Sequence, residues 1–188
     1  MVRTHEKPAK PAIWTVARYH RAIEAGIFTD WAVELLNGVI FEMSPEGPLH
    51  SGDIGSADRY LRKLIAENQA WFRLGNPVTL ERSEPEPDIA IVKPSESGYK
   101  DRHPCLSDIL LIIEFSDSSL ERDTEGEKYQ TYAMEGIPDY WVVNLRDKVL
   151  QVNRDPDQTE YKSRLICASG SIKPLLLDIQ IDVERLLA

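Results

Sequence analysis

The sequence predicts one α/β (α+β) domain, in which a central mixed β-sheet is flanked by helices. The chain of 188 residues suits a single domain with a sizeable core, and 42% of its residues are hydrophobic. Residues 109–113 are all apolar, which is typical of a central strand that is buried on both faces. The expected elements run in the order helix, hairpin, helix, strands, helix, strands. This order favours one sheet with a helix on each face.

The first expected elements follow a short leader. Residues 1–12 contain several charges and prolines and are expected to be a flexible leader, so that the domain spans residues 13–188. Residues 15–26 begin with a threonine that can cap a helix and end at a glycine, which predicts a short helix. Residues 32–43 place an Asn-Gly pair between two β-rich runs, and this pair is the strongest local signal for a hairpin.

An amphipathic helix and several strands are expected next. From about Gly52 to Asn68, apolar residues recur at helical spacing while basic residues occupy the outer face. The apolar positions of this helix are Ala57, Tyr60, Leu61, Leu64 and Ile65. Two short segments, 71–74 and 77–80, and a firmer one, 87–92, are expected to be strands.

The second half of the chain repeats this change between helix and strand. Residues 125–136 predict a helix that ends at a glycine, with a proline two positions beyond it. Residues 139–145, 148–154 and 161–167 predict strands, the first two joined by a tight turn. A last turn of helix is expected in residues 182–188.

The composition indicates in which cellular compartment the protein is expected and which kinds of binding partner are not. The net charge of −9 argues against a protein that coats nucleic acid or anionic membranes by bulk electrostatics, but it does not exclude an enzyme whose acidic residues hold a divalent metal. The longest apolar run is far shorter than the roughly 20 residues of a membrane helix, and the N-terminus lacks the apolar core of a secretory signal. Cys105 and Cys167 fit neither a disulfide framework nor a zinc pattern. We therefore expect a cytoplasmic protein that does not associate with membranes.

Several common catalytic patterns are absent from the sequence. It contains no phosphate-binding glycine loop, no GxGxxG, no HExxH, no CxxC and no GxSxG. Serine, histidine and aspartate are all present, but nothing in the sequence places them together. A triad hydrolase is therefore not expected.

Two carboxylates at strand ends are more informative. Asp88 opens one expected strand, and Glu114 ends the apolar run of another. If these strands are neighbours in the sheet, the two carboxylates can approach one point near its edge. Such hard oxygen ligands suit Mg²⁺ or Mn²⁺, which would also offset the cost of burying the charges. Alternatively, Asp88 caps a turn, and Glu114 is solvated or paired with a basic residue.

Three segments of the sequence carry a resemblance to a known family. "VELLNGVIFEMSPEGPLH", "PEPDIAIV" and "IIEFSDSSLERDTEGEKYQTYAMEGIPDYWVVNL" resemble the Uma-type family of bacterial restriction-endonuclease-like proteins. The resemblance runs from about Val33 to the end of the chain and is most specific in residues 109–145. That family is similar to the PD-(D/E)XK nuclease superfamily, so the resemblance implies a small mixed sheet flanked by helices.

The resemblance assigns roles to individual residues. It implies that Asp88 and Glu114 are metal ligands and that the backbone carbonyl of Phe115 adds a third oxygen. The usual lysine of the superfamily would fall at position 116, where this chain has Ser116. The resemblance implies that the lysine role has moved to the following helix, at Lys128. There it would orient the attacking water and neutralise developing negative charge.

Two further positions match the family. Glu34 corresponds to an acidic position that would assist the metal through water, and His50 matches a typical position without an assigned role. A structural interpretation competes with each of these roles. Under it, Lys128 is an exposed helix lysine, Glu34 faces solvent beside the hairpin turn, and His50 caps or precedes the long helix. Tyr132 and Trp141 also match the family, but aromatic residues there are expected in the core.

Two functions from different classes follow from these observations. The first is an endonuclease that hydrolyses DNA phosphodiester bonds with Mg²⁺ or Mn²⁺, as a homodimer, through Asp88, Glu114 and Lys128. Basic residues expected to contact DNA phosphates are Arg59, Arg62, Lys63, Lys93, Lys100 and Arg102. The second is a degenerate family member that acts as a noncatalytic dimeric module for protein interaction, with a vestigial acidic cluster.

Overall fold

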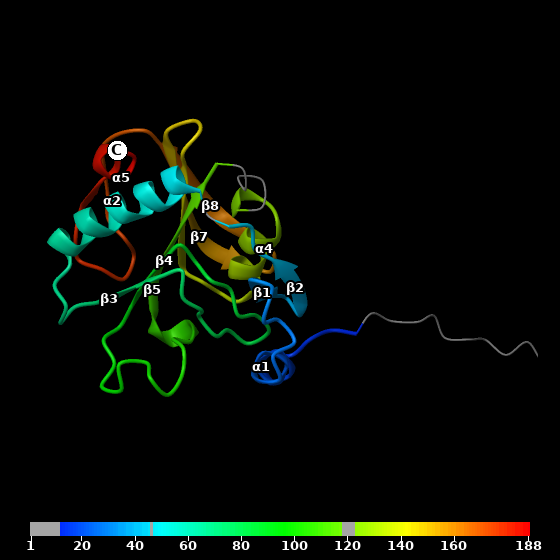
Figure 1. Cartoon of the computed structure of the whole chain (residues 1–188). Helices are drawn as coiled ribbons and strands as arrows, with labels where there is room; N and C mark the ends of the chain where they lie inside the picture. The colour runs from blue at the N-terminus through cyan, green and yellow to red at the C-terminus, as the bar shows by residue number, and fades with distance from the viewer. Residues whose placement is uncertain (1–11, 46, 118–122) are drawn as a thin grey trace, which may run out of the picture.

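The computed structural model describes residues 12–45, 47–117 and 123–188 (Figure 1), so residues 1–11 of the expected leader lie outside the described part. The helices are α1 (Val16–Glu24), α2 (Pro48–Leu64), α4 (Glu127–Met134), α5 (Val183–Leu186) and the short 3₁₀ helix η1 (Leu106–Asp108). The strands are β1 (Val33–Leu36), β2 (Val39–Glu42), β3 (Trp71–Leu74), β4 (Ile89–Val92), β5 (Ile109–Ser116), β6 (Asp139–Asn144), β7 (Val149–Asp157), β8 (Glu160–Cys167), β9 (Ser171–Ile172) and β10 (Ile181–Asp182). None of the described helices is long and apolar enough to cross a membrane.

Six of the strands form one mixed sheet in the order β3-β4-β5-β6-β7-β8. β5 and β6 are parallel, whereas each of the other neighbouring pairs is antiparallel. A parallel pair needs a long crossover connection, and here that connection contains α4. The predicted mixed sheet is therefore confirmed. Two small antiparallel sheets, β1-β2 and β9-β10, accompany it.

The helices cover both faces of this sheet. α2 and α5 pack on one face, where their apolar residues join those of the central strands in one core cluster. α4 packs on the opposite face, in a second core cluster. In Figure 1, α2 and α5 lie to the left of the sheet and α4 lies to its right. β5 is buried along its whole length because it lies between these two layers.

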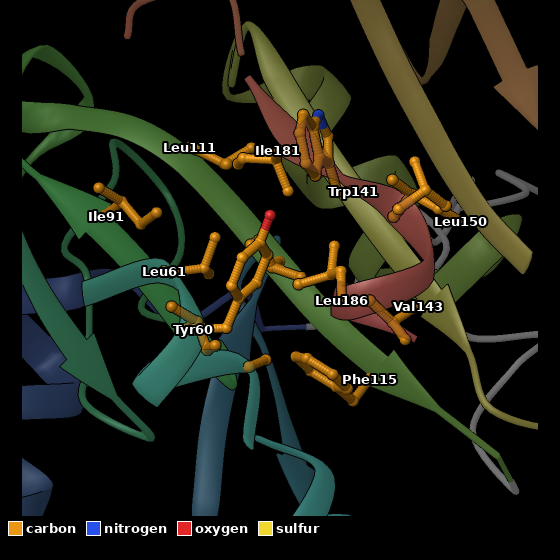
Figure 2. Close-up of a cluster of buried hydrophobic side chains, with 14 of the residues drawn as sticks. Tyr60, Leu61, Ile91, Leu111, Phe115, Trp141, Val143, Leu150, Ile181 and Leu186 are labelled. Carbon is orange, nitrogen blue, oxygen red and sulfur yellow. The ribbon is translucent and has the colours of Figure 1, made fainter. Parts of the chain in front are cut away.

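The first core cluster joins elements that are distant in the sequence (Figure 2). Leu61 of α2 and Leu111 of β5 are fully buried in this cluster, and Leu186 of α5 and Val143 of β6 belong to it as well. Trp141 of β6 is fully buried, and its indole nitrogen donates a 2.7 Å hydrogen bond to Asp139 Oδ1. The core therefore fixes α2 and α5 against the central strands.

Replacement of Leu61 by alanine is expected to lower the free energy of unfolding by about 2–5 kcal/mol, because the cavity left in this core collapses only partly. Leu49 lies on the same helix and is 86% exposed, so Leu49→Ala is the matched control and should change stability by less than about 0.5 kcal/mol. Urea unfolding of both variants measures the difference. Equal losses in the two variants would contradict this description of the core.

The β1-β2 hairpin is built around the predicted Asn-Gly turn. Asn37 and Gly38 both have left-handed backbones, with φ values of 49° and 76°. A Cβ at position 38 would lie 2.9 Å from the carbonyl oxygen of Trp14, so only glycine fits there. Backbone hydrogen bonds attach the hairpin to the rest of the chain: two join Leu35 and Glu84, at 2.7 and 3.3 Å, and Gly38 bonds to Arg82 at 3.1 Å and to Trp14 at 2.9 Å.

The amphipathic helix begins earlier than the sequence predicted. α2 spans Pro48–Leu64 rather than about 52–68, since Gly47 stands at its N-cap and Pro48 occupies its first turn. A proline there is favourable, because the first helical N–H has no partner in the helix. The helix ends when Ile65 becomes extended. The other predicted helices and the hairpin are observed, with ends that differ by one or two residues.

The strand predicted for residues 77–80 is wrong. The backbone N–H groups of Val78, Thr79 and Leu80 bond to Pro85, Pro104 and Ser83, respectively. Ser83 and Pro85 belong to the turn that directly follows this run, and Pro104 lies in a distant loop, so the backbone N–H groups are satisfied by irregular contacts instead of a neighbouring strand.

Candidate active site

The pairing of β4 with β5 brings Asp88 and Glu114 together. The two strands are antiparallel, and Ile89 at the start of β4 faces Ile113 near the end of β5. The backbone N–H of Phe115 donates a 2.6 Å hydrogen bond to Asp88 Oδ2, and the N–H of Asp88 donates a 3.3 Å bond to Glu114 Oε2. The neighbouring strands anticipated from the sequence therefore place both carboxylates at one point.

Lys128 reaches the same point from α4. Its Nζ donates a 2.8 Å hydrogen bond to Glu114 Oε1 and lies 3.8 Å from Glu34 Oε2, and its side chain is 4% exposed. Nζ also donates to the carbonyl of Glu86 at 3.3 Å. α4 presents Lys128 inward because Tyr129 and other apolar residues of the helix pack on the sheet. The interpretation of Lys128 as an exposed helix lysine is therefore wrong.

Ser116 has a structural role at the position where the resemblance would place a lysine. Its hydroxyl donates a short hydrogen bond to Asp123 Oδ2. The hydroxyl of Tyr140 donates a 2.7 Å bond to the carbonyl of Asp123. Position 116 therefore joins the end of β5 to the segment that precedes α4.

Glu34 and His50 also lie at this site. Glu34 of β1 is fully buried, and its Oε2 accepts a 3.3 Å hydrogen bond from the N–H of Glu86. The interpretation that Glu34 faces solvent is therefore wrong. His50 lies in the first turn of α2, with Nε2 at 3.5 Å from Asp88 Oδ1. The side chains of Glu34 and His50 therefore lie close to those of Lys128 and Asp88, respectively.

These residues line a cavity of about 770 Å³. Its charged or ionisable lining residues are Glu34, His50, Glu86, Asp88, Glu114, Asp117, Asp123 and Lys128. Six carboxyl groups thus face one lysine and one histidine. The cavity, referred to below as the acidic cavity, therefore attracts cations and repels anions.

Burial and neighbouring charges shift the pKa values at this site. Burial and, to a smaller extent, the charges of Asp88 and Asp123 raise the pKa of Glu114 while the Lys128 charge lowers it, and the pKa lies at about 8 as a result. Burial also tends to raise the pKa of Asp88, but His50, the Lys128 charge and the Phe115 N–H hold it below its usual value. Asp88 is therefore ionised at neutral pH.

Lys128 keeps its proton in this environment. Burial alone lowers the pKa of Lys128, but the carboxylates of Glu114 and Glu34 raise it by more, so the pKa lies above its ordinary value. Burial and the neighbouring Glu34 raise the pKa of Glu86. The site thus holds a fixed cation beside carboxyl groups that are costly to ionise together.

The donor atoms of the cavity suit a hard cation. Among residues 12–45, 47–117 and 123–188, no group of three or more His, Cys, Asp or Glu side chains is placed to hold a metal ion. Mg²⁺ commonly takes only one or two carboxylates and keeps several waters. The adjacent carboxylates of Asp88 and Glu114 fit that requirement, whereas zinc favours a closed set of nitrogen and sulfur ligands.

Three residues of this site were not predicted from the sequence to belong to it. Tyr132 was expected in the core and is fully buried, but its hydroxyl also donates a 2.8 Å hydrogen bond to Glu114 Oε1. Tyr132 follows Lys128 by four positions, and this helical spacing could have indicated a shared face. Glu86 enters the cavity from the irregular segment before β4, where no periodic signal exists, and Asp123 enters it from the two helical residues 123–124 that precede α4.

Comparisons with known proteins concern the family and the fold of this chain. The family model described as "Uma2: Putative restriction endonuclease" matches residues 16–185. A crystal structure of "a putative nuclease belonging to DUF820 from Anabaena variabilis ATCC 29413" is similar to this chain, with a TM-score of 0.67 and 14% sequence identity, over 84% of this chain and 90% of that one. At this identity the likeness concerns the fold, and it confirms the predicted α+β architecture. No curated protein matches the chain. Because the family model spans most of its length, the chain belongs to the Uma2 family, described as "Putative restriction endonuclease".

Proposed function

We propose that this protein is a metal-dependent endonuclease that hydrolyses phosphodiester bonds of DNA. The observation that carries the proposal is the position of Lys128, whose Nζ lies 2.8 Å from Glu114 Oε1 although it comes from a helix. A buried lysine beside two strand-end carboxylates supports the proposal, because it combines oxygen ligands for a divalent cation with a fixed positive charge that can stabilise the phosphoryl transition state. The alternative, a noncatalytic dimeric module, does not require a buried cation at this point.

Asp88 and Glu114 would hold Mg²⁺ or Mn²⁺, with the carbonyl oxygen of Phe115 as a further ligand and Glu34 acting through water. The bound cation would polarise a phosphoryl oxygen and lower the pKa of a water molecule. Lys128 and Tyr132 both donate to Glu114 Oε1, which fixes this carboxyl group in one orientation. The remaining oxygen, Oε2, therefore stays beside Asp88.

Lys128 would act on the reacting groups as a positioned cation. Its ammonium carries three N–H donors and can orient the attacking water while it offsets charge that develops on the phosphate. His50 lies next to Asp88 at the mouth of the cavity and is only partly buried. It would donate a hydrogen bond to an entering phosphodiester.

The charge of the acidic cavity makes a bound cation necessary for DNA to approach. A phosphodiester is an anion, and the six carboxyl groups repel it until a divalent cation offsets part of their charge.

We further propose a homodimer, because cleavage of both DNA strands needs two active sites. The two cysteines form no disulfide, in keeping with the reducing cytoplasm in which DNA would be met.

Nicking of supercoiled plasmid DNA tests the proposal. We expect the protein to convert supercoiled to open circular plasmid with Mg²⁺ or Mn²⁺, and we expect EDTA to reduce this rate to the background of a protein-free sample. Restoring the metal should restore the rate. No nicking with either metal, together with no heat of metal binding in calorimetry, would favour the noncatalytic module instead.

A further inference from the structure

A second cavity lies at the other end of β5 from the acidic cavity. It has a volume of about 430 Å³ and adjoins α1 and the loop that follows β4. Both of these segments lie in the lower part of Figure 1, whereas the first turn of α2 at the acidic cavity lies in the upper part. The two cavities share no lining residue. Five residues with basic or aromatic side chains line the second cavity, referred to below as the basic cavity: His20, Tyr99, Lys100, Arg102 and His103.

Arg73 of β3 stands beside this cavity as a partly buried cation that lacks an anion. Its Nε is buried and has no hydrogen-bond partner, and its Nη2 lies 3.5 Å from His103 Nδ1. No carboxylate of the described residues forms an ion pair with it. Its guanidinium carbon lies 5.8 Å from the centre of the Tyr99 ring, and burial lowers its pKa. Burying a charge without a partner costs free energy, so an anion at this point would be stabilising.

Two carboxylates at the basic cavity bond to other groups: Asp101 is one of its lining residues, and Glu84 lies beside its lining residues Thr79 and His20. Glu84 accepts hydrogen bonds from Thr79 Oγ1 at 2.6 Å and lies 2.8 Å from His20 Nε2. Asp101 accepts a 2.6 Å bond from the hydroxyl of Ser97. Neither carboxylate forms an ion pair with Arg73.

Arg102 is the second guanidinium of the cavity. Its Nη1 donates to Asp108 Oδ2 at 2.6 Å and to the carbonyl of His103 at 3.0 Å. Both bonds use Nη1, so the other N–H groups of this half-exposed side chain can meet a ligand. Its guanidinium carbon lies 5.5 Å from the centre of the Tyr99 ring, so both guanidinium groups lie near this ring.

We propose that the basic cavity binds a phosphate group through Arg73, Lys100 and Arg102. Guanidinium groups match the geometry of phosphate oxygens, and the Lys100 ammonium adds a point charge at the exposed rim. The histidine rings supply further hydrogen-bond donors. Tyr99 is 8% exposed, so its ring is not open to stack on a base and the phosphate itself is the recognised group. The phosphate comes either from a free nucleotide or from a nucleic-acid strand, and the site does not depend on the nuclease activity.

Titration calorimetry in the presence of EDTA tests this site, because EDTA excludes phosphate binding through a metal in the acidic cavity. The probes are inorganic phosphate, thymidine 5′-monophosphate and a short oligothymidylate. We expect saturable binding of inorganic phosphate with one site per chain. Arg73→Gln should weaken it by about tenfold or more, and Lys100→Gln by about threefold, since each removes one charged contact.

Lys148→Gln is the matched control, because Lys148 is exposed on the turn between β6 and β7. It should leave the affinity unchanged. Lys100 is exposed, so Lys100→Gln tests the site even if Arg73→Gln fails to fold, and circular dichroism checks both. Tighter binding of the monophosphate than of the oligonucleotide identifies a free nucleotide, and the reverse order identifies a strand. No saturable binding of any probe, or equal affinity in Lys100→Gln and wild type, would overturn the proposal.

Discussion

Replacement of Lys128 by methionine is expected to lower the rate of plasmid nicking by a factor of about 10²–10³, the loss typical of removing one group that stabilises transition-state charge. Lys128 Nζ contacts both Glu114 and the carbonyl of Glu86, and its side chain is almost fully buried, so solvent supplies no substitute. Methionine keeps the volume and the apolar stem but removes the charge. A plasmid assay at saturating Mn²⁺ measures the effect.

The free energy of unfolding of Lys128→Met distinguishes a chemical role for Lys128 from a structural one. Removing one partner of a buried ion pair costs about 3–5 kcal/mol, but here the loss should be smaller, because Glu114 can keep its proton once the Lys128 charge no longer lowers its pKa. Lys148→Met serves as the surface control and should change neither rate nor stability. A folded Lys128→Met protein that nicks at the wild-type rate would remove Lys128 from the proposed machinery.

Asp88→Asn is expected to weaken Mn²⁺ binding by at least about tenfold and to reduce nicking to a similar or larger extent, because a neutral amide is a poorer ligand for a hard cation. The variant keeps an oxygen that can accept the hydrogen bond from the Phe115 N–H, so the local backbone should persist. Calorimetry of metal binding and the plasmid assay give the two values independently.

Glu96→Gln is the matched control for Asp88→Asn, since Glu96 is exposed in the loop after β4 and lines neither cavity. It should bind Mn²⁺ with wild-type affinity. Metal-dependent nicking that survives in Asp88→Asn, at wild-type metal affinity, would show that the ion binds elsewhere on the protein.

The positions of Asp88 and Glu114 could be predicted because each adjoins a strongly apolar strand. The apolar pattern places both residues at strand ends, but only the sheet order shows that these ends adjoin. The position of Lys128 followed from the family resemblance alone. Its inward direction depends on how Tyr132 and its neighbours pack α4 on the sheet, and a sequence pattern does not specify that packing.

The sequence-based predictions that were wrong or incomplete also failed for physical reasons. Residues 77–80 have strand-like composition, but a strand needs a partner strand, and here the bonds go to the turn at residues 83–85 and to Pro104. The start of α2 was placed late because the apolar periodicity begins after its first turn, which lies at the acidic cavity. The buried position of Glu86 depends on contacts of an irregular segment, which leave no periodic signature in the sequence.

The separate β1-β2 hairpin has a consequence for motion. It carries Glu34 to the acidic cavity and belongs to its own small sheet, and it joins the rest of the domain through backbone bonds to Trp14, Arg82 and Glu84 and a 2.9 Å bond from Asn37 Nδ2 to Thr131 Oγ1. β5, in contrast, pairs with a neighbouring strand along each of its edges, so opening of the hairpin alone is expected to cost less free energy than global unfolding. Amide protons of the hairpin should therefore exchange with solvent sooner than those of β5, and such an opening would uncover Glu34 while the central sheet stays paired.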